Sequence, residues 1–362
     1  MPNELVSLPK ADSVINSVVV KIRNSHWAAG KAALGILAAA LSLAGLAQAE
    51  IRQTTLLNVS YDVTREFYRD YNAFFATFWN EKTGKKVVIH QSHGGWSRQV
   101  RAVLDGLEAD VITMSQVNDV DILAGDGRLI PQDWAVRFPY NSAPYTSTTV
   151  FLVRKNNPRN ILDWNDLIKP GVSVIIPNPK LSGNGRYSYL AAWGYIKKKG
   201  SSDRDAKDFV SSLFRNTPVL NGRGRAATTT FVQRGMGDVL ITFENEAFLA
   251  RREFGNDKFD VAYPSVSVLA ENPISVVDKV IDKRGTRELA TSYLENLYSE
   301  EAQELAARHY FSPRNGRVVA RHAATFKNIG LFTVDELFGS RSKAQTAHFN
   351  DGGLFDQIYH VK

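Results

Sequence analysis

Hydrophobic residues switch repeatedly between two spacings along the chain, and this pattern predicts strands and helices in alternation. Residues 54–61 are expected to form the first strand. The next residues, 65–79, place large aromatic side chains on one face of a helix: Phe67, Tyr71, Phe74, Phe75 and Phe78. We expect this stripe to be part of the core.

The order of strand, Gly-containing turn and helix then recurs. Further strands are expected at 86–90, 109–114, 172–176 and 238–243. Further helices are expected at 99–107, 119–124, from 186 onward, 203–214, 229–234, 288–310 and 333–348. Such alternation predicts an α/β fold with mostly parallel sheets and helices on both faces.

The pattern changes at residues 141–154, where a Pro-containing turn leads into a long β-rich run. We interpret this run as a strand that crosses between two lobes, and residues 259–262 as the return. The predicted division is lobe 1 at 50–144 and 264–362, and lobe 2 at 145–263, with a hinge of two strands.

The segment from Ile175 to Arg186 combines a strand, a turn of sequence Ser-Gly-Asn-Gly and the start of a helix. Unpaired N–H groups in the first turn of a helix, together with the helix dipole, favour an anion. Ser182 adds a hydroxyl donor. A similar turn at Gly94-Gly95 precedes Trp96. The segment alone also fits a simple helix N-cap and tight turn.

The first 49 residues have the pattern of a secretory signal peptide. Basic residues between 10 and 31 lead into an apolar stretch at 32–46, which is followed by Ala47-Gln48-Ala49. We expect export to the periplasm with cleavage after Ala49. The alternative, a membrane anchor, would need about 20 apolar residues.

The amino-acid composition argues against several classes of site and partner. The chain has 44% hydrophobic and 22% charged residues, a net charge of +7 and no cysteine, which excludes disulfides and thiolate metal sites. No basic tract suggests nucleic acid. Asp119 and Asp121 are interpreted as helix-capping residues and His93 as a hydrogen-bonding turn residue, so we expect no metal and no cofactor.

Several segments together resemble the periplasmic sulfate-binding proteins of ABC importers. They are 56–62, 91–95, 141–148, 169–180, 190–195 and 237–241. The resemblance implies a two-lobe periplasmic binding protein of type II that closes over its ligand at a two-strand hinge.

The resemblance also implies a ligand site made of backbone N–H groups and neutral side chains. The matching positions are Asp62, Trp96, Ser182, Gly183, Asn184, Gly224 and Phe243. Three of these depart from the family pattern. Trp96 stands where Ser is usual, Asn184 where Gly is usual, and Phe243 where a Trp usually donates its indole N–H to the anion.

We therefore expect a solute-binding protein, not an enzyme, that delivers sulfate or thiosulfate to the membrane permease of an ABC importer. We expect it to act as a monomer. One alternative keeps this role for an organosulfate, a sulfonate or another tetrahedral oxyanion. The other is an exported ester hydrolase that uses Ser182, although the sequence around Ser182 lacks the Gly-x-Ser-x-Gly motif.

Overall fold

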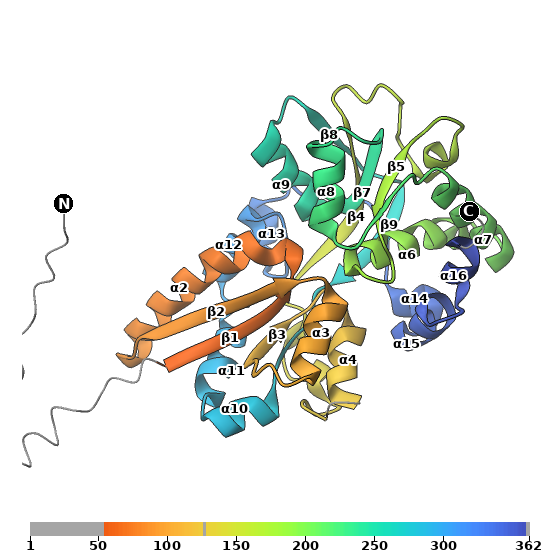
Figure 1. The fold of residues 1–362 in the computed structure, drawn as a ribbon. Helices are drawn as coiled ribbons and strands as arrows, with labels where there is room; N and C mark the ends of the chain where they lie inside the picture. The colour runs from red at the N-terminus through yellow and green to blue at the C-terminus, as the bar shows by residue number, and fades with distance from the viewer. Residues whose placement is uncertain (1–53, 126–127, 360–362) are drawn as a thin grey trace, which may run out of the picture. The chain divides into compact units, whose positions relative to one another are not determined.

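The computed structural model describes residues 54–125 and 128–359. The expected signal peptide, residues 1–49, lies outside these residues. The described chain forms two lobes, each built on its own sheet (Figure 1). None of its helices is both long and apolar enough to cross a membrane.

The first lobe contains a sheet of four strands in the order β10-β3-β1-β2. These are β1 (Thr54–Tyr61), β2 (Val87–Gly94), β3 (Val111–Thr113) and β10 (Ile274–Val276). The first three are parallel, and β10 is antiparallel to β3. The surrounding helices are η2 (Asp62–Thr64), α2 (Arg65–Thr83), α3 (Trp96–Leu104), α4 (Val117–Gly125), η3 (Trp134–Val136), α5 (Pro139–Ser142), α10 (Asp278–Arg284), α11 (Arg287–Asn296), α12 (Glu300–Arg308) and α13 (Gly316–Arg321).

The second lobe contains a sheet whose main order is β12-β9-β4-β7-β5-β6. Its strands are β4 (Tyr145–Arg154), β5 (Val174–Pro177), β6 (Leu220–Asn221), β7 (Val239–Phe243), β8 (Phe259–Ala262), β9 (Val266–Glu271), β11 (Ser312–Pro313) and β12 (Gly330–Phe332). Strands β5, β6 and β7 are parallel, whereas β4 runs antiparallel to β7, β8 and β9. The helices are η4 (Trp164–Ile168), α6 (Gly183–Lys198), α7 (Asp203–Arg215), α8 (Gly224–Val232), α9 (Glu244–Phe254), α14 (Val334–Phe338), α15 (Arg341–Ala344), η5 (Gln345–Phe349) and α16 (Leu354–Tyr359).

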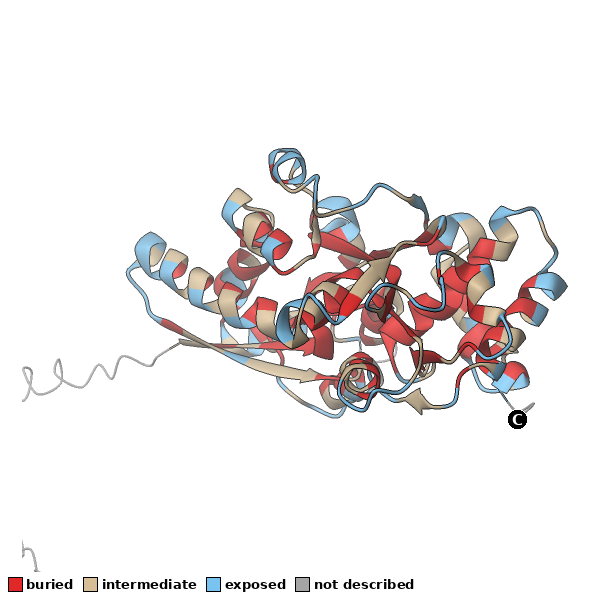
Figure 2. Ribbon diagram, turned by 90° about the horizontal axis from the view of Figure 1, so that it is seen from above, coloured by how far each residue is buried: buried red, intermediate tan, exposed pale blue. Residues whose placement is uncertain are grey.

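Helices cover both faces of each sheet, as predicted, and each face has its own apolar cluster. The aromatic stripe of α2 belongs to the core of the first lobe, because Phe67, Tyr71 and Phe75 are buried there. Phe74 and Phe78 are only partly buried, at the edge of this cluster. Buried residues are concentrated in the strands and on the inward sides of the helices (Figure 2).

Three chain crossings join the sheets, and the last of them lies between β10 and β11, because β11 pairs with β4 and β12 with β9. The first is at the start of β4, as expected. The expected return at 259–262 is wrong: β8 pairs with Phe151–Arg154 of β4 and remains in the second sheet. The chain returns between β9 and β10, because β9 pairs with Thr146–Thr148 and β10 pairs with β3.

The C-terminal segment also differs from the expected division. Residues 333–348 were expected to pack on the first lobe. Instead, the core of the second lobe includes Phe332, Val334, Ala344, Phe349, Phe355 and Ile358. An apolar contact explains this docking: a Cβ added to Gly194 on α6 would lie 2.1 Å from the Phe332 ring. The absent side chain at 194 therefore makes room for Phe332.

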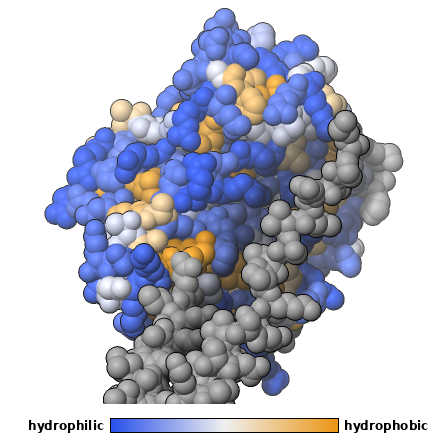
Figure 3. Space-filling view, turned by 60° about the vertical axis from the view of Figure 1, so that its left-hand side comes forward, coloured by the Kyte–Doolittle hydropathy of each residue, from blue (hydrophilic) through white to orange (hydrophobic). Residues whose placement is uncertain are grey.

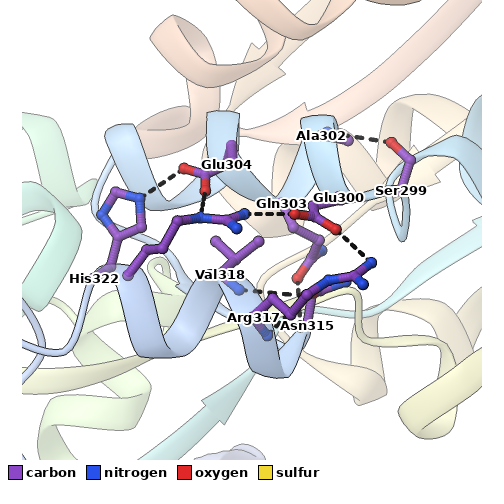
Figure 4. Close-up of polar contacts among 10 residues, drawn as sticks. Ser299, Glu300, Ala302, Gln303, Glu304, Asn315, Arg317, Val318 and His322 are labelled. Carbon is purple, nitrogen blue, oxygen red and sulfur yellow. Dashed lines mark hydrogen bonds and ion pairs between the residues drawn. The ribbon is translucent and has the colours of Figure 1, made fainter.

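Ion pairs attach α13 to α12 on the outside of the first lobe (Figure 4). Glu300 is paired with Arg317 at 2.6 Å and with Arg321 at 2.8 Å. Glu304 accepts hydrogen bonds from Arg321 and from Nε2 of His322. Hydrophilic residues predominate on the face shown in Figure 3, where the hydrophobic residues form small separate patches.

Candidate ligand-binding site

The candidate site lies where strands of both sheets end and helices begin. In the first lobe these junctions are β1 to η2, β2 to α3, and β3 to α4. In the second lobe they are β5 to α6, β6 to α8, and β7 to α9. The carboxyl ends of parallel strands share one edge of a sheet, and crevices at that edge bind ligands in open α/β folds.

Close approaches show that these edges meet. A Cβ added to Gly224 would lie 3.3 Å from Cγ1 of Val63 and 3.1 Å from Nδ2 of Asn184. A Cβ added to Gly95 would lie 3.3 Å from the carbonyl oxygen of Leu181. Glycine at these positions lets the backbones of the two lobes come together, as a backbone-lined anion site requires.

Asp62 is buried and follows β1 directly. Its Oδ2 accepts a hydrogen bond of 3.3 Å from the backbone N–H of Arg225, in the other lobe. Burial raises the pKa of the Asp62 carboxyl, and the hydrogen bond from Arg225 acts against this rise. The carboxylate is thus held by a backbone N–H group of the second lobe.

The turn at Ser182, Gly183 and Asn184 starts α6. Ser182 is its N-cap and accepts a 3.4 Å hydrogen bond from the N–H of Gly185, which leaves the hydroxyl hydrogen free to donate. Asn184 donates from Nδ2 to Oγ1 of Thr242 at 2.8 Å. The Asn184 side chain therefore serves to join α6 to β7.

Gly183 lies against the first lobe. A Cβ added there would lie 2.0 Å from Oγ of Ser115, the second residue after β3. Ser115 is buried, and nothing in its local sequence suggested a role. Its position after the third parallel strand is the signal that could have identified it, because the other expected site residues also follow strands.

Phe243 ends β7 and is fully buried. Its ring packs against Tyr187 of α6, with 5.8 Å between the ring centres. Phe243 has no polar atom to offer an anion, so its contribution is apolar packing behind the turn of α6. The side chain of Trp96 lies outside what the structure describes, but α3 begins at this residue.

A second contact between the lobes flanks the turn. Arg186 is buried, and its Nη1 donates a 3.0 Å hydrogen bond to Oε1 of Gln116. Burial lowers the pKa of Arg186 to about 10. Asp119, one turn further along α4, is also fully buried; burial raises its pKa to about 7, against the charge of Arg186. The sequence predicts only a helix-capping role for Asp119 and does not indicate this burial.

His93 connects two neighbouring strands of the first sheet. His93 lies in β2 and not in a turn, but it does form the expected hydrogen bond, with its Nδ1 3.1 Å from the carbonyl oxygen of Tyr61. Burial lowers the pKa of His93 to about 4. No His, Asp or Glu side chain hydrogen-bonds to the Ser182 hydroxyl within the described part of the chain. The same residues include no group of three or more His, Cys, Asp or Glu that could hold a metal ion.

Known proteins resemble this chain in sequence and in fold. The sequence model of the bacterial extracellular solute-binding protein family matches residues 63–312. The chain is 54% identical over 324 residues to the thiosulfate-binding protein of Pseudomonas aeruginosa, an alignment covering 90% of this chain and 97% of the relative. It is 56% identical over 304 residues to the sulfate-binding protein of Escherichia coli, covering 84% and 92%. Among solved structures, the sulfate-binding protein SubI from Mycobacterium tuberculosis superimposes with a TM-score of 0.74 at 31% identity, covering 82% of this chain and 100% of SubI.

Proposed function

The chain belongs to the bacterial extracellular solute-binding protein family, and from this premise we propose that it captures sulfate or thiosulfate in the periplasm for an ABC importer. The observation that carries the proposal is the meeting of strand-to-helix junctions from two lobes at Asp62, Gly95 and Gly224. The relatives named for sulfate and for thiosulfate are almost equally similar to this chain, so the proposal includes both anions.

We propose that the ligand lies between the first turns of these helices. The proposed donors are the N–H groups of Asp62, Trp96, Gly183, Asn184 and Gly224, together with the Ser182 hydroxyl. A buried dianion loses several kcal/mol of solvation. Each hydrogen bond to a charged acceptor contributes about 1.5–3 kcal/mol, so roughly half a dozen such donors offset that loss. The Phe243 side chain would form part of the apolar wall of the site without donating a hydrogen bond.

This arrangement selects against protonated oxyanions. A site made of donors offers no acceptor to the O–H of hydrogen phosphate, and an unpaired buried hydroxyl costs about 1–3 kcal/mol. Sulfate and thiosulfate are fully ionised at neutral pH and carry no such hydrogen.

Opening and closing of the lobes would admit the ligand. We propose that the hinge lies at 143–145 and 271–274, two of the three places where the chain passes between the two sheets. We also propose that lobe 2 includes residues 330–359, because their apolar side chains pack in its core. A single chain with both lobes free to move would present its closed form to the permease, so we propose a monomer.

Export is part of the proposal, with cleavage after Ala49. N-terminal sequencing of the protein recovered from the periplasm tests this step. A mature chain that starts at Glu50 supports it, and a chain that retains residues 32–46 contradicts it.

A thermal-shift panel tests the choice of ligand. Sulfate, thiosulfate, molybdate, phosphate and two alkyl sulfonates are compared at equal concentration. We expect stabilisation by sulfate or thiosulfate and almost none by phosphate. Stabilisation by sulfonates alone would assign the site to organic ligands, and stabilisation by none of the anions would contradict the proposed function.

A matched pair of variants then tests Ser182. Ser182 caps α6, and Ser202 caps α7 in the same lobe through the N–H of Asp205. Both Ser182→Ala and Ser202→Ala lose a helix cap, worth about 1 kcal/mol of stability. Only Ser182→Ala should weaken sulfate binding, by roughly 10- to 100-fold. Equal sulfate affinities in the two variants would show that the Ser182 hydroxyl does not bind the anion. Hydrolysis of a sulfate ester that is lost only in Ser182→Ala would favour a hydrolase.

A further inference from the structure

A groove of about 310 Å³ lies beside the proposed site and is lined by arginine side chains from both lobes. Arg65 comes from the first turn of α2 in the first lobe. Arg223 precedes α8 and Arg234 follows it, in the second lobe. All three residues are exposed, and Asp62 and Arg225 form the inner part of the groove.

The groove has an excess of positive charge. Arg225 is neutralised by its neighbours, since it lies 3.0 Å from Glu66, 3.0 Å from Glu246 and 3.7 Å from Glu253. Within residues 54–125 and 128–359, by contrast, Arg65, Arg223 and Arg234 form no ion pair with an acidic side chain. The carboxylate of the groove, Asp62, is buried and already bonded to the Arg225 amide.

The groove adjoins the junctions that form the proposed site. Cγ of Arg223 lies 3.4 Å from the position of a Cβ on Gly95, and Arg223 is followed directly by Gly224. The charges of Arg223 and Arg65 reach the site, because they contribute to the pKa shifts of Asp62 and His93 respectively. The arginines therefore border the candidate site without being among its proposed ligands.

This placement assigns close-range binding of the anion to the backbone amides and long-range attraction of the anion to the arginines. Amide dipoles hold an anion at short range, but they attract it weakly from a distance. Full charges that line a concave wall focus the field and raise association rates by roughly 10- to 1,000-fold. A guanidinium also forms paired N–H contacts with tetrahedral oxyanions, which a bare ammonium group does not.

We propose that Arg65, Arg223 and Arg234 form a second anion site at the mouth of the cleft, where a divalent tetrahedral oxyanion binds weakly before it passes to the inner site. The identity of that anion rests on the proposed function. Because the three side chains are exposed to solvent, this outer site exchanges rapidly and increases the association rate more than the final affinity.

Stopped-flow measurement of tryptophan fluorescence with inorganic sulfate or thiosulfate tests the proposal. The variant carries Arg65→Gln, Arg223→Gln and Arg234→Gln. The control carries Arg128→Gln, Arg204→Gln and Arg308→Gln, which are exposed residues outside the groove and lose the same total charge. At about 0.01 M salt we expect the association rate to fall about tenfold in the groove variant and less than twofold in the control.

Two further results are expected from the same data. The dissociation rate should change less than twofold, and the salt dependence of association should flatten only in the groove variant. Equal association rates in the two triple variants, or a loss that lies entirely in the dissociation rate, would overturn the proposal.

A second measurement does not depend on the inner site. Arginine Nε–H signals are followed by NMR while inorganic sulfate is added to the wild type and to Gly183→Ala, which blocks the inner site through Ser115. Weak, saturable shifts of Arg65, Arg223 and Arg234 in both proteins would support the outer site. Their absence would overturn it even where the inner site binds tightly. If the wild type showed these arginine shifts but no tight binding of sulfate, only the proposed function would be contradicted.

Discussion

Nη1 of Arg186 donates a 3.0 Å hydrogen bond to Oε1 of Gln116 and so joins the first turn of α6 to the start of α4 across the two lobes. Arg186 and Gln116 are both buried, with exposed fractions of 3% and 5%. A charged donor placed there without an acceptor would be costly. The contact therefore favours the arrangement in which the lobes are together, and it would have to break for the lobes to open as proposed.

Gln116→Met should weaken ligand binding because it removes this acceptor from the closed form alone. A hydrogen bond to a charged group is worth about 1.5–3 kcal/mol, so the dissociation constant should rise roughly 10- to 100-fold by calorimetry. Gln132→Met is the control, since Gln132 donates to the Ala124 carbonyl within the first lobe. Equal affinities in the two variants would show that Gln116 does not contribute to closure.

Gly183→Ala should impair closure for a steric reason. Its Cβ would lie 2.0 Å from Oγ and 2.9 Å from Cβ of Ser115. We expect at least a tenfold loss of affinity by calorimetry, comparable with the roughly 1–3 kcal/mol that overpacking costs.

Two variants make the steric explanation specific. Adding Ser115→Gly should restore most of the affinity lost in Gly183→Ala. Gly316→Ala is the control, because Gly316 also starts a helix but a Cβ there meets no atom within 4 Å. Failure of Ser115→Gly to rescue binding would contradict the steric account.

The contribution of Asp119 to the free energy of unfolding should decrease as pH rises from about 4 to about 7. Burial raises the folded-state pKa of its carboxyl from an ordinary value of 3.8 to about 7. Between these two values the folded protein holds this proton more tightly than the unfolded chain. The contribution of Asp119 to stability is therefore fully present below about pH 4 and is lost as pH rises to about 7.

Urea unfolding at about pH 5 and about pH 8 measures this effect. Burial also raises the pKa values of Glu244 and Glu246 to about 7, so these residues lower the stability of every variant as pH rises. The effect of Asp119 is therefore measured as the difference in pH dependence between variants. Asp119→Asn should lose less stability over the interval than the wild type, and the exposed Asp208→Asn should behave as the wild type does. The same pH dependence in all three proteins would contradict the prediction.

Phe243→Trp should tighten sulfate binding if an indole N–H reaches the inner site. One added hydrogen bond to the anion is worth about 1.5–3 kcal/mol, or roughly 10- to 100-fold in affinity. The larger ring must fit beside Tyr187 in a fully buried position, so we expect a lower melting temperature for the unliganded protein. Unchanged or weaker binding would indicate that the inner site does not need a donor at 243.

The alternation of elements was predictable from the sequence because each strand and helix carries its own periodicity. Helix α2 and its buried aromatic face followed from the spacing of Phe67, Tyr71 and Phe75. The two-lobe α/β architecture followed from the order of the elements and from the family resemblance. Helix α8 begins at Gly224, five residues before its predicted start, because glycine there serves close packing against Val63 rather than a loop.

Contacts between distant segments were not predictable in this way. Nothing near Phe332 in the sequence indicates that its ring packs beside Gly194, and this contact places the C-terminal helices on the second lobe. The neighbourhood of Ser115 and Gly183 also depends on how two lobes meet. The set of ligand-binding residues itself remains a prediction, which rests on the family resemblance and on the positions of these residues at strand ends.

The central claim is that main-chain amides from both lobes converge on a single anion, and backbone NMR tests it most directly. Sulfate or thiosulfate is added to isotope-labelled protein up to one equivalent. We predict that the amide signals of Asp62, Trp96, Gly183, Asn184 and Gly224 move downfield together and saturate at one anion per chain. Shifts confined to one lobe, or an unchanged spectrum with both anions, would contradict the account.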